Sequence, residues 1–246
     1  MSIRKIKLTI QYDGADYHGW QVQPGHRTIQ GELTEALRGL TGADIGVTGA
    51  SRTDAGVSAL GQTACFEIDS PIPTQNFTKA LNDRLPEDIA VSEVVEMPLD
   101  FDVVGDVTNK MYRYSICTAA VRPALNIRHC WHHPHSLDPE RMHEAAQYLV
   151  GKHDFKSFAS AADDRESSVR TIFRCDVTRE GDWIYVETEG DGFLYNMVRN
   201  IVGTLTDVGA GRTPPAKIKD ILAAKDRTAA GPIAPAAGLC LIRIDY

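Results

Sequence analysis

Apolar residues in the first hundred positions switch between the spacing of a strand and the spacing of a helix. A strand ending at the turn pair Asp13-Gly14 is predicted where every second residue is apolar, at Ile6, Leu8, Ile10 and Tyr12. A helix is predicted where apolar residues recur every three or four positions, at Ile29, Leu33, Ala36, Leu37 and Leu40. Further on, the pattern predicts a weak strand near 44–47, a strand over 64–68, a helix over 74–85 and a strand over 89–95.

The same order of elements returns in the rest of the chain. It predicts a strand over 112–116, a helix that begins at Asp138-Pro139, a hairpin of 172–178 and 183–188, helices over 194–208 and 216–224, and a strand over 240–244. Strand, helix, two strands, helix, strand is the ferredoxin-like, or RRM-like, order. We therefore predict an α+β protein of two tandem ferredoxin-like halves, 1–103 and 104–246. They would form a mixed, largely antiparallel sheet with helices on one face and a central cleft where the halves meet.

Composition narrows the functional classes only in part. The chain of 246 residues has a net charge of −7, which argues against a uniformly basic surface but is compatible with a basic cleft. It has no apolar run of 18 residues, and its first residues lack the pattern of a signal peptide, so we expect a cytoplasmic protein without a membrane span. Five cysteines without a C-x-x-C pair are expected to be reduced and mostly buried.

Three polar residues are candidates for chemistry. Asp54 lies in the loop 50-ASRTDAGVSAL-60, Tyr112 opens the second half, and Arg199 lies in an otherwise apolar helix. An unpartnered buried guanidinium would cost several kcal/mol, so a carboxylate is expected opposite Arg199. Each residue also has a structural interpretation: Asp54 as a turn residue, Tyr112 as a half-buried strand aromatic, and Arg199 as half of a stabilising ion pair.

A histidine-rich segment, 129-HCWHHPH-135, raises the alternative of a metal-dependent hydrolase. The segment is broken by proline, and no carboxylate completes the H-E-x-x-H pattern, so we expect no metal there. The run 209-GAGR-212 is a fragment of a dinucleotide-binding fingerprint. It follows a helix rather than a strand, which indicates a helix terminus.

Eight ordered segments resemble the tRNA pseudouridine synthase A family over nearly the whole chain. They are 12-YDGADYHGWQVQ-23, 28-TIQGELTEAL-37, the SRTDAGVSA loop, 82-NDRLPEDIAV-91, 112-YRYSI-116, 153-HDFKSF-158, 192-GFLYNMVRNIVG-203 and 224-AKDR-227.

The resemblance implies an enzyme that isomerises uridine to pseudouridine in the anticodon arm of tRNA, at positions 38, 39 or 40. It implies a catalytic Asp54, an active-site Tyr112 that stacks near the target base, and an ion pair between Arg199 and Asp54. It further implies that Arg52 displaces the target nucleotide, that Leu194 packs beneath the aromatic ring, and that two subunits of a homodimer grip one tRNA. Since isomerisation changes neither oxidation state nor charge, no cofactor is expected.

The sequence departs from the family pattern at three positions. Ser51 replaces the usual glycine, Ser58 replaces the usual histidine, and the usual arginine between the halves is replaced near Val104. These changes leave open a catalytically weakened RNA-binding or tRNA-chaperone protein of the same fold. Binding of tRNA requires that basic residues gather on the cleft side, with candidates Arg27, Lys79, Arg84, Lys110 and Arg165.

Overall fold

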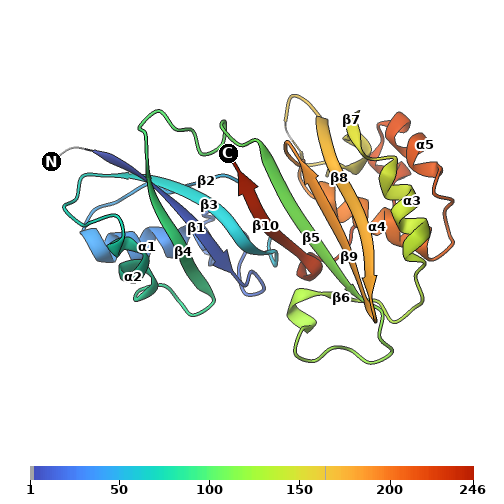
Figure 1. Cartoon of the computed structure of the whole chain (residues 1–246), viewed down its shortest axis with the longest axis horizontal. Helices are drawn as coiled ribbons and strands as arrows, with labels where there is room; N and C mark the ends of the chain where they lie inside the picture. The colour runs from blue at the N-terminus through green and yellow to red at the C-terminus, as the bar shows by residue number, and fades with distance from the viewer. Residues whose placement is uncertain (1–2, 164) are drawn as a thin grey trace. The chain divides into compact units, whose positions relative to one another are not determined.

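The computed structural model describes residues 3–163 and 165–246, which form ten mostly antiparallel strands and five α-helices (Figure 1). The predicted α+β class is thereby confirmed. The chain divides into two compact units, the residues up to 108 together with 241–246, and residues 109–240. None of the helices built from the described residues is long and apolar enough to cross a membrane.

The first unit has the predicted order of elements. They are β1 (Arg4–Tyr12), α1 (Ile29–Thr41), β2 (Thr48–Gly49), β3 (Ser58–Ile68), α2 (Asn76–Asn82) and β4 (Ile89–Met97). The strands lie in the order β4-β1-β3-β2, and every neighbouring pair is antiparallel. The weak strand predicted at 44–47 is only two residues long and lies at 48–49.

Apolar and polar residues alternate along β1, and its apolar residues form part of the core of this unit. Ile6, Leu8 and Ile10 are fully buried on the face that α1 and α2 cover (Figure 1). Across the sheet Ile6 pairs with Phe66, whose ring meets Phe77 of α2 edge-on at 5.7 Å. Apolar residues at period two in the strand and at helical spacing in α1 therefore bury the same interior.

The second unit follows the same logic with more elements. They are β5 (Asn109–Cys117), β6 (Trp131–His132), α3 (Pro139–Gln147), β7 (Gly151–Asp154), β8 (Val169–Glu180), β9 (Trp183–Gly190), α4 (Met197–Gly209) and α5 (Lys217–Ala224). The last strand, β10 (Leu239–Asp245), starts in this unit, and its residues from 241 on belong to the first unit. The order β5-β9-β8-β7 is antiparallel throughout. The predicted hairpin and helices are confirmed, whereas β6 and β7 were not predicted, since strands of two and four residues carry almost no periodicity.

The boundary between the units differs from the predicted halves, 1–103 and 104–246. It lies at 108/109, and the last six residues belong to the first unit. The reason is a close approach to β3: a Cβ at Gly61 would lie 2.5 Å from the carbonyl oxygen of Ile242. A contact between residues so far apart in sequence leaves no mark on local periodicity.

Helix α4 is the most buried helix of the second unit, and a returning segment packs directly on it. A Cβ at Gly203 would lie 1.6 Å from the carbonyl oxygen of Pro232. The hydroxyl of Thr204 accepts a hydrogen bond from the backbone N–H of Gly231 at 3.0 Å. The glycine is therefore required by the backbone that crosses the helix at this point.

We predict that Gly203→Ala lowers the free energy of unfolding by about 1–3 kcal/mol, because the methyl group cannot fit without moving the helix from the Pro232 carbonyl. Gly39→Ala is the matched control, since Gly39 also lies in a helix but has its nearest neighbour, the Arg84 side chain, 3.8 Å from the Cβ position. The control should be unchanged or stabilised by up to about 1 kcal/mol. Urea unfolding followed by circular dichroism measures both, and equal midpoints would contradict the packing.

Candidate active site

The loop that carries Asp54 lies between β2 and β3 of the first unit, and backbone hydrogen bonds tie it to the turn after β1. The N–H of Trp20 donates to the carbonyl of Thr53 at 3.0 Å, and the N–H of Gly56 donates to the carbonyl of Tyr17 at 3.2 Å. Asp54 lies between these two bonds and is half-buried. Its position is therefore set by the backbone on both sides.

Two glycines allow the turn and the loop to approach this closely. A Cβ at Gly14 would lie 2.0 Å from the carbonyl oxygen of Val57. A Cβ at Gly19 would lie 2.5 Å from the carbonyl oxygen of Thr53, and the φ of +85° at Gly19 favours glycine on its own account. The glycines of the segment 12-YDGADYHGW-20 thus leave room for the backbone of the Asp54 loop.

A buried amide organises the base of the same loop. Gln62 is fully buried, and its Nε2 donates to the carbonyl of Ser51 at 2.7 Å while its Oε1 accepts from the N–H of Ser51 at 3.3 Å. The hydroxyl of Tyr12 shares a hydrogen bond of 2.8 Å with the hydroxyl of Thr53. Both ends of the Ser51–Thr53 stretch are therefore fixed by side chains of β1 and β3.

The two serine departures from the family pattern belong to this framework. Ser51 is buried and bonds to Gln62 through its backbone, while the hydroxyl of Ser58 accepts from the N–H of Gly14 at 3.1 Å. Val104, the third departure, is exposed and bonds through its N–H to Asp102. Arg52, by contrast, is exposed, between the buried Ser51 and Thr53.

Tyr112 is a buried residue of β5 in the second unit, opposite Thr188 of β9. Its ring meets the ring of Phe193 edge-on at 5.2 Å and 85°. Phe193 was not among the predicted site residues, although it lies within the segment 192-GFLYNMVRNIVG-203. The adjacent Leu194 is buried, and its packing beneath the ring of Tyr112 stays a prediction.

Arg199 is half-buried in α4, as predicted, and the returning segment fixes its side chain. Its Nε donates to the carbonyl of Ala234 at 2.8 Å, and its Nη1 donates to Oδ1 of Asn196 at 2.9 Å. The backbone carbonyl of Arg199 in turn accepts from the N–H of Ala234 at 3.1 Å. The guanidinium is thus oriented within its own unit before any substrate binds.

A second tyrosine of β5 lies close to this arginine. The hydroxyl of Tyr114 donates to the carbonyl of Pro235 at 2.7 Å. Burial raises the pKa of Tyr114 far above its ordinary value, and the nearby charge of Arg199 offsets this only in part. Tyr114 is therefore a neutral hydrogen-bond donor that secures the segment holding Arg199.

The predicted site residues fall into two groups. Asp54 and Arg52 belong to one loop of the first unit, whereas Tyr112, Leu194 and Arg199 belong to the second unit. Within the second unit, Phe193, whose ring contacts Tyr112, lies in the sequence just before α4, the helix that carries Arg199. The ion pair between Asp54 and Arg199 stays a prediction.

Three other features of the chain could hold a ligand, beginning with the histidine-rich segment. Nε2 of His132 lies 2.9 Å from the carbonyl oxygen of Ala119, and the ring of His133 packs edge-on against Trp131 at 5.1 Å. Over residues 3–163 and 165–246, no three His, Cys, Asp or Glu side chains are grouped so as to hold a metal ion.

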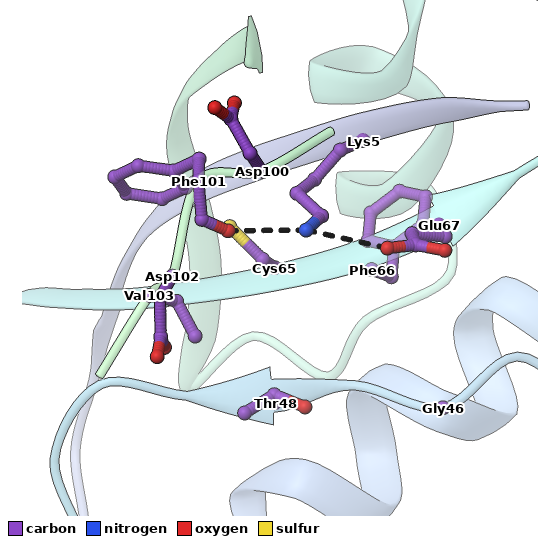
Figure 2. Close-up of a pocket in the computed structure, with 10 residues that line it drawn as sticks. All are labelled: Lys5, Gly46, Thr48, Cys65, Phe66, Glu67, Asp100, Phe101, Asp102 and Val103. Carbon is purple, nitrogen blue, oxygen red and sulfur yellow. Dashed lines mark hydrogen bonds and ion pairs between the residues drawn. The ribbon is translucent and has the colours of Figure 1, made fainter. Parts of the chain in front are cut away.

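A cavity of about 470 Å³ lies in the first unit, and its lining residues do not include Asp54 (Figure 2). Its one lysine, Lys5, lies 3.0 Å from the carbonyl oxygen of Phe101 and 3.3 Å from the carboxylate of Glu67. Asp100 and Asp102 also line it. Because carboxylates outnumber the single paired cation, this cavity does not suit a polyanion.

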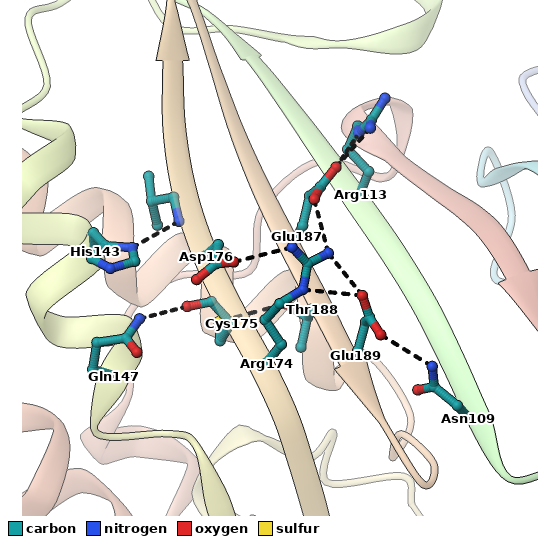
Figure 3. A network of polar contacts seen from close by, with 11 residues as sticks. Asn109, Arg113, His143, Gln147, Arg174, Cys175, Asp176, Glu187, Thr188 and Glu189 are labelled. Atoms are coloured by element: carbon teal, nitrogen blue, oxygen red, sulfur yellow. Dashed lines mark hydrogen bonds and ion pairs between the residues drawn. The ribbon is translucent and has the colours of Figure 1, made fainter.

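The face of the second-unit sheet that points away from the helices carries an ion-pair network (Figure 3). Arg174 pairs with Glu187, Glu189 and Asp176 at 3.1, 2.7 and 3.1 Å, and Arg113 also pairs with Glu187. Three carboxylates thus face two guanidiniums. Such a surface is satisfied internally and gives a polyanion no net attraction.

Comparisons with known proteins give one consistent result. A family model described as tRNA pseudouridine synthase matches residues 8–104 and 145–246. The chain is 44% identical over 244 residues to the tRNA pseudouridine synthase A of Caldicellulosiruptor saccharolyticus, covering 99% of this chain and 100% of that protein. It is 46% identical over 244 residues to the protein of that name from Geobacillus kaustophilus, with coverage of 99% and 95%. The corresponding protein of Acetivibrio thermocellus is 45% identical, with coverage of 99% and 100%.

We predict that Gln62→Leu lowers the free energy of unfolding by about 2 kcal/mol, because the buried N–H and carbonyl of Ser51 lose their side-chain partner. Gln23→Leu is the matched control: Gln23 bonds to the carbonyl of His18 at 3.0 Å but is exposed, so the change should stay within about 0.5 kcal/mol. Chemical unfolding of the two variants checks this. If both variants unfold alike, Gln62 does not organise the loop.

Proposed function

The chain belongs to the tRNA pseudouridine synthase family, and on that premise we propose that it isomerises uridine to pseudouridine in tRNA with Asp54 as the reactive group. The main support is the match to relatives over 99% of the chain, which includes the Asp54 loop. The family model itself covers Asp54 and Arg199 but not Tyr112, which only the full-length relatives cover. The resemblance in the sequence motifs is thereby confirmed at the level of the family.

The reaction needs only groups that this chain supplies. The N1–C1′ bond of the nucleoside breaks, the uracil turns, C5 forms the new bond to C1′, and the proton of C5 is lost while N1 gains one. No electrons enter or leave. An ionised aspartate serves as the nucleophile at C1′ or on the ring, or as the base, and the proposal covers these routes.

The other site residues prepare this step. Arg199, already oriented by Ala234 and Asn196, pairs with Asp54 and keeps its carboxylate ionised. The target base leaves its stack at a cost of a few kcal/mol, offset by stacking on Tyr112 and by insertion of Arg52 into the vacated space. Leu194 supports the aromatic ring from below. The exposure of Arg52 is compatible with this role.

The substrate in this proposal is the anticodon arm of tRNA, with uridines at positions 38, 39 or 40 as targets. Two copies of the chain act as a homodimer on one tRNA in the cytoplasm. Phosphate contacts supply most of the affinity, so binding weakens as salt rises.

A second candidate is a tRNA-binding or chaperone protein with little catalytic rate. The observation that favours it is the pair of buried serines, Ser51 and Ser58, in the framework of the Asp54 loop. Substitution there can shift the carboxylate, and a misplacement of about 1 Å is enough to reduce a rate 100-fold.

We predict that Asp54→Asn reduces pseudouridine formation at least about 100-fold while folding and tRNA affinity stay near those of the unmodified protein, because the amide cannot act as nucleophile or base. Tritium release from tRNA containing 5-tritiated uridine measures the rate. Asp44→Asn is the matched control, since Asp44 is exposed and its carboxylate pairs with Arg38 of α1.

The two candidate functions give different results in this assay. No tritium release by the unmodified protein at saturating concentration would favour the chaperone. Release that Asp54→Asn leaves unchanged would keep the isomerase but remove Asp54 from its assigned role. The control variant should release tritium at the full rate.

The homodimer gives a separate prediction. Light scattering of the purified protein at micromolar concentration should give twice the chain mass of 27.0 kDa, because two subunits are proposed to share one tRNA. A protein that has the mass of one chain by itself, and that binds tRNA as one chain per tRNA, would contradict the binding of one tRNA by two subunits.

A further inference from the structure

Two of the segments that resemble the family, 153-HDFKSF-158 and 224-AKDR-227, have no part in the proposed reaction, and both meet helix α4 at Asn200. This residue is 1% exposed. Its Nδ2 donates to the carbonyl of Phe158 at 2.7 Å, and its Oδ1 accepts from Nη2 of Arg227 at 2.9 Å. One buried amide therefore joins both segments to the helix that carries the arginine of the candidate site.

The backbone just before Arg227 is bonded to the first of these segments as well. The buried hydroxyl of Ser157 accepts from the N–H of Asp226 at 2.9 Å and donates to the carbonyl of Ile221 at 2.5 Å. The chain at the end of α5 is thus fixed on the second-unit core through Ser157. The side chain of Arg227 is fixed separately through Asn200, so its direction and its origin are both determined.

The guanidinium of Arg227 joins two acceptors from different parts of the chain. Besides the bond to Asn200, its Nη1 donates to the carbonyl of Ala230 at 3.4 Å. A planar guanidinium can donate to two acceptors at once in a fixed geometry. Because the amide of Asn200 is buried, loss of the guanidinium would leave its oxygen without this donor, which is unfavourable. Arg227 therefore ties the start of the chain after α5 to α4.

The chain that follows Arg227 runs along α4 toward Arg199. The N–H of Gly231 donates to the hydroxyl of Thr204 at 3.0 Å. Three residues later, the N–H of Ala234 donates to the carbonyl of Arg199 at 3.1 Å. The carbonyl of Ala234 accepts from Nε of Arg199 at 2.8 Å. One stretch of chain thus has Arg227 at its beginning and the group that orients Arg199 near its end.

This stretch, 228-TAAGPIAP-235, has few side chains that could hold it in place by packing. Most of its residues are small, and its largest side chain, Ile233, is 43% exposed. Ala234 is its one buried residue. Burial of apolar surface therefore contributes little to its position. The hydrogen bonds to α4 and the anchor at Arg227 set where the carbonyl of Ala234 lies.

We propose that Arg227 is a positioning residue for Arg199. Bound to Asn200, it keeps residues 228–235 against α4, and this keeps the carbonyl of Ala234 where Nε of Arg199 binds it. The assignment rests on the proposed function, in which Arg199 pairs with Asp54. Arg227 is assigned no contact with the substrate.

The first test is the kinetics of tritium release from 5-tritiated tRNA by the full-length protein. Arg227→Met keeps the apolar stem of the side chain and removes its donors. It should lower kcat at least about tenfold and leave KM within about twofold, because a displaced Arg199 impairs the reaction and not tRNA binding. Arg227→Lys, which keeps a charged donor, should lose less. A raised KM with full kcat would make Arg227 a tRNA contact and overturn the proposal.

A second background separates positioning from a general effect on the fold. Arg199→Lys keeps the positive charge but lacks the Nε–H that the carbonyl of Ala234 accepts. If Arg227 acts through Arg199, adding Arg227→Met to this variant should lower the remaining kcat less than about twofold, because the two changes remove the same interaction. An equal loss in both backgrounds would overturn the positioning role.

Arg212→Met is the matched control. Arg212 also ties the chain to α4, through its ion pair with Asp207, but near the C-terminal end of the helix, and its side chain is 57% exposed. Its kcat and KM should equal those of the unmodified protein. A loss as large as that of Arg227→Met would show that any arginine bound to α4 has this effect, and it would overturn the proposal.

Nuclear magnetic resonance measures the order of Arg199 without turnover. In protein labelled with ¹⁵N-arginine, the Nε–H signal of Arg199 is assigned by its loss in Arg199→Lys. Its heteronuclear NOE should be high in the unmodified protein, since Ala234 binds this N–H, and should fall in Arg227→Met but not in Arg212→Met. An unchanged NOE in Arg227→Met would overturn the proposal.

Failure of the proposed function is visible separately. An unmodified protein that releases no tritium would reject the isomerase, while the NOE still decides whether Arg227 orients Arg199. Conversely, tritium release by Arg227→Met with the kcat and KM of the unmodified protein would keep the isomerase and reject the positioning role.

Discussion

The close approach of two backbone segments in the first unit is the constraint on which the candidate chemistry depends. The turn after β1 and the loop before β3 touch through carbonyl oxygens that leave no room for a side chain at Gly14 or Gly19. Hydrogen bonds from Trp20 and Gly56 then hold Asp54 between two fixed points. An aspartate on a free loop would sample many orientations, whereas this one is restricted by the backbone at both ends.

The second unit restrains its arginine by the same means. Arg199 lies on a buried helix, and the returning segment binds its guanidinium through Ala234 and its backbone carbonyl through the adjoining N–H. Gly203 lets this segment cross the helix at van der Waals limits. In each unit, therefore, a side chain of the candidate site is oriented by a close crossing of main chains at a glycine, and the side chains around it are buried to support that crossing.

Local periodicity predicted most of the fold because β1, α1, β8 and β9 each bury one regular face. It failed where an element is too short for a period, as in β6 and β7, and where a contact joins distant residues, as between Gly61 and Ile242. For the site, the motifs pointed to Asp54, Tyr112 and Arg199, but single-residue chemistry left structural alternatives open for each. Phe193 was missed because nothing in its neighbours distinguishes a ring that contacts Tyr112 from any other apolar residue before a helix.

The distribution of charge explains how a chain with a net charge of −7 can offer a site for RNA. In the second-unit sheet, alternation sends Glu187 and Glu189 to one face and Lys110 with Tyr112 to the other. The glutamates are neutralised locally by Arg113 and Arg174, so their charge reaches only a short distance in salt solution. Lys110 on the opposite face is half-buried and is therefore less screened by salt. Net charge therefore says little about the partner, because the partner experiences the charges of one face and not their sum.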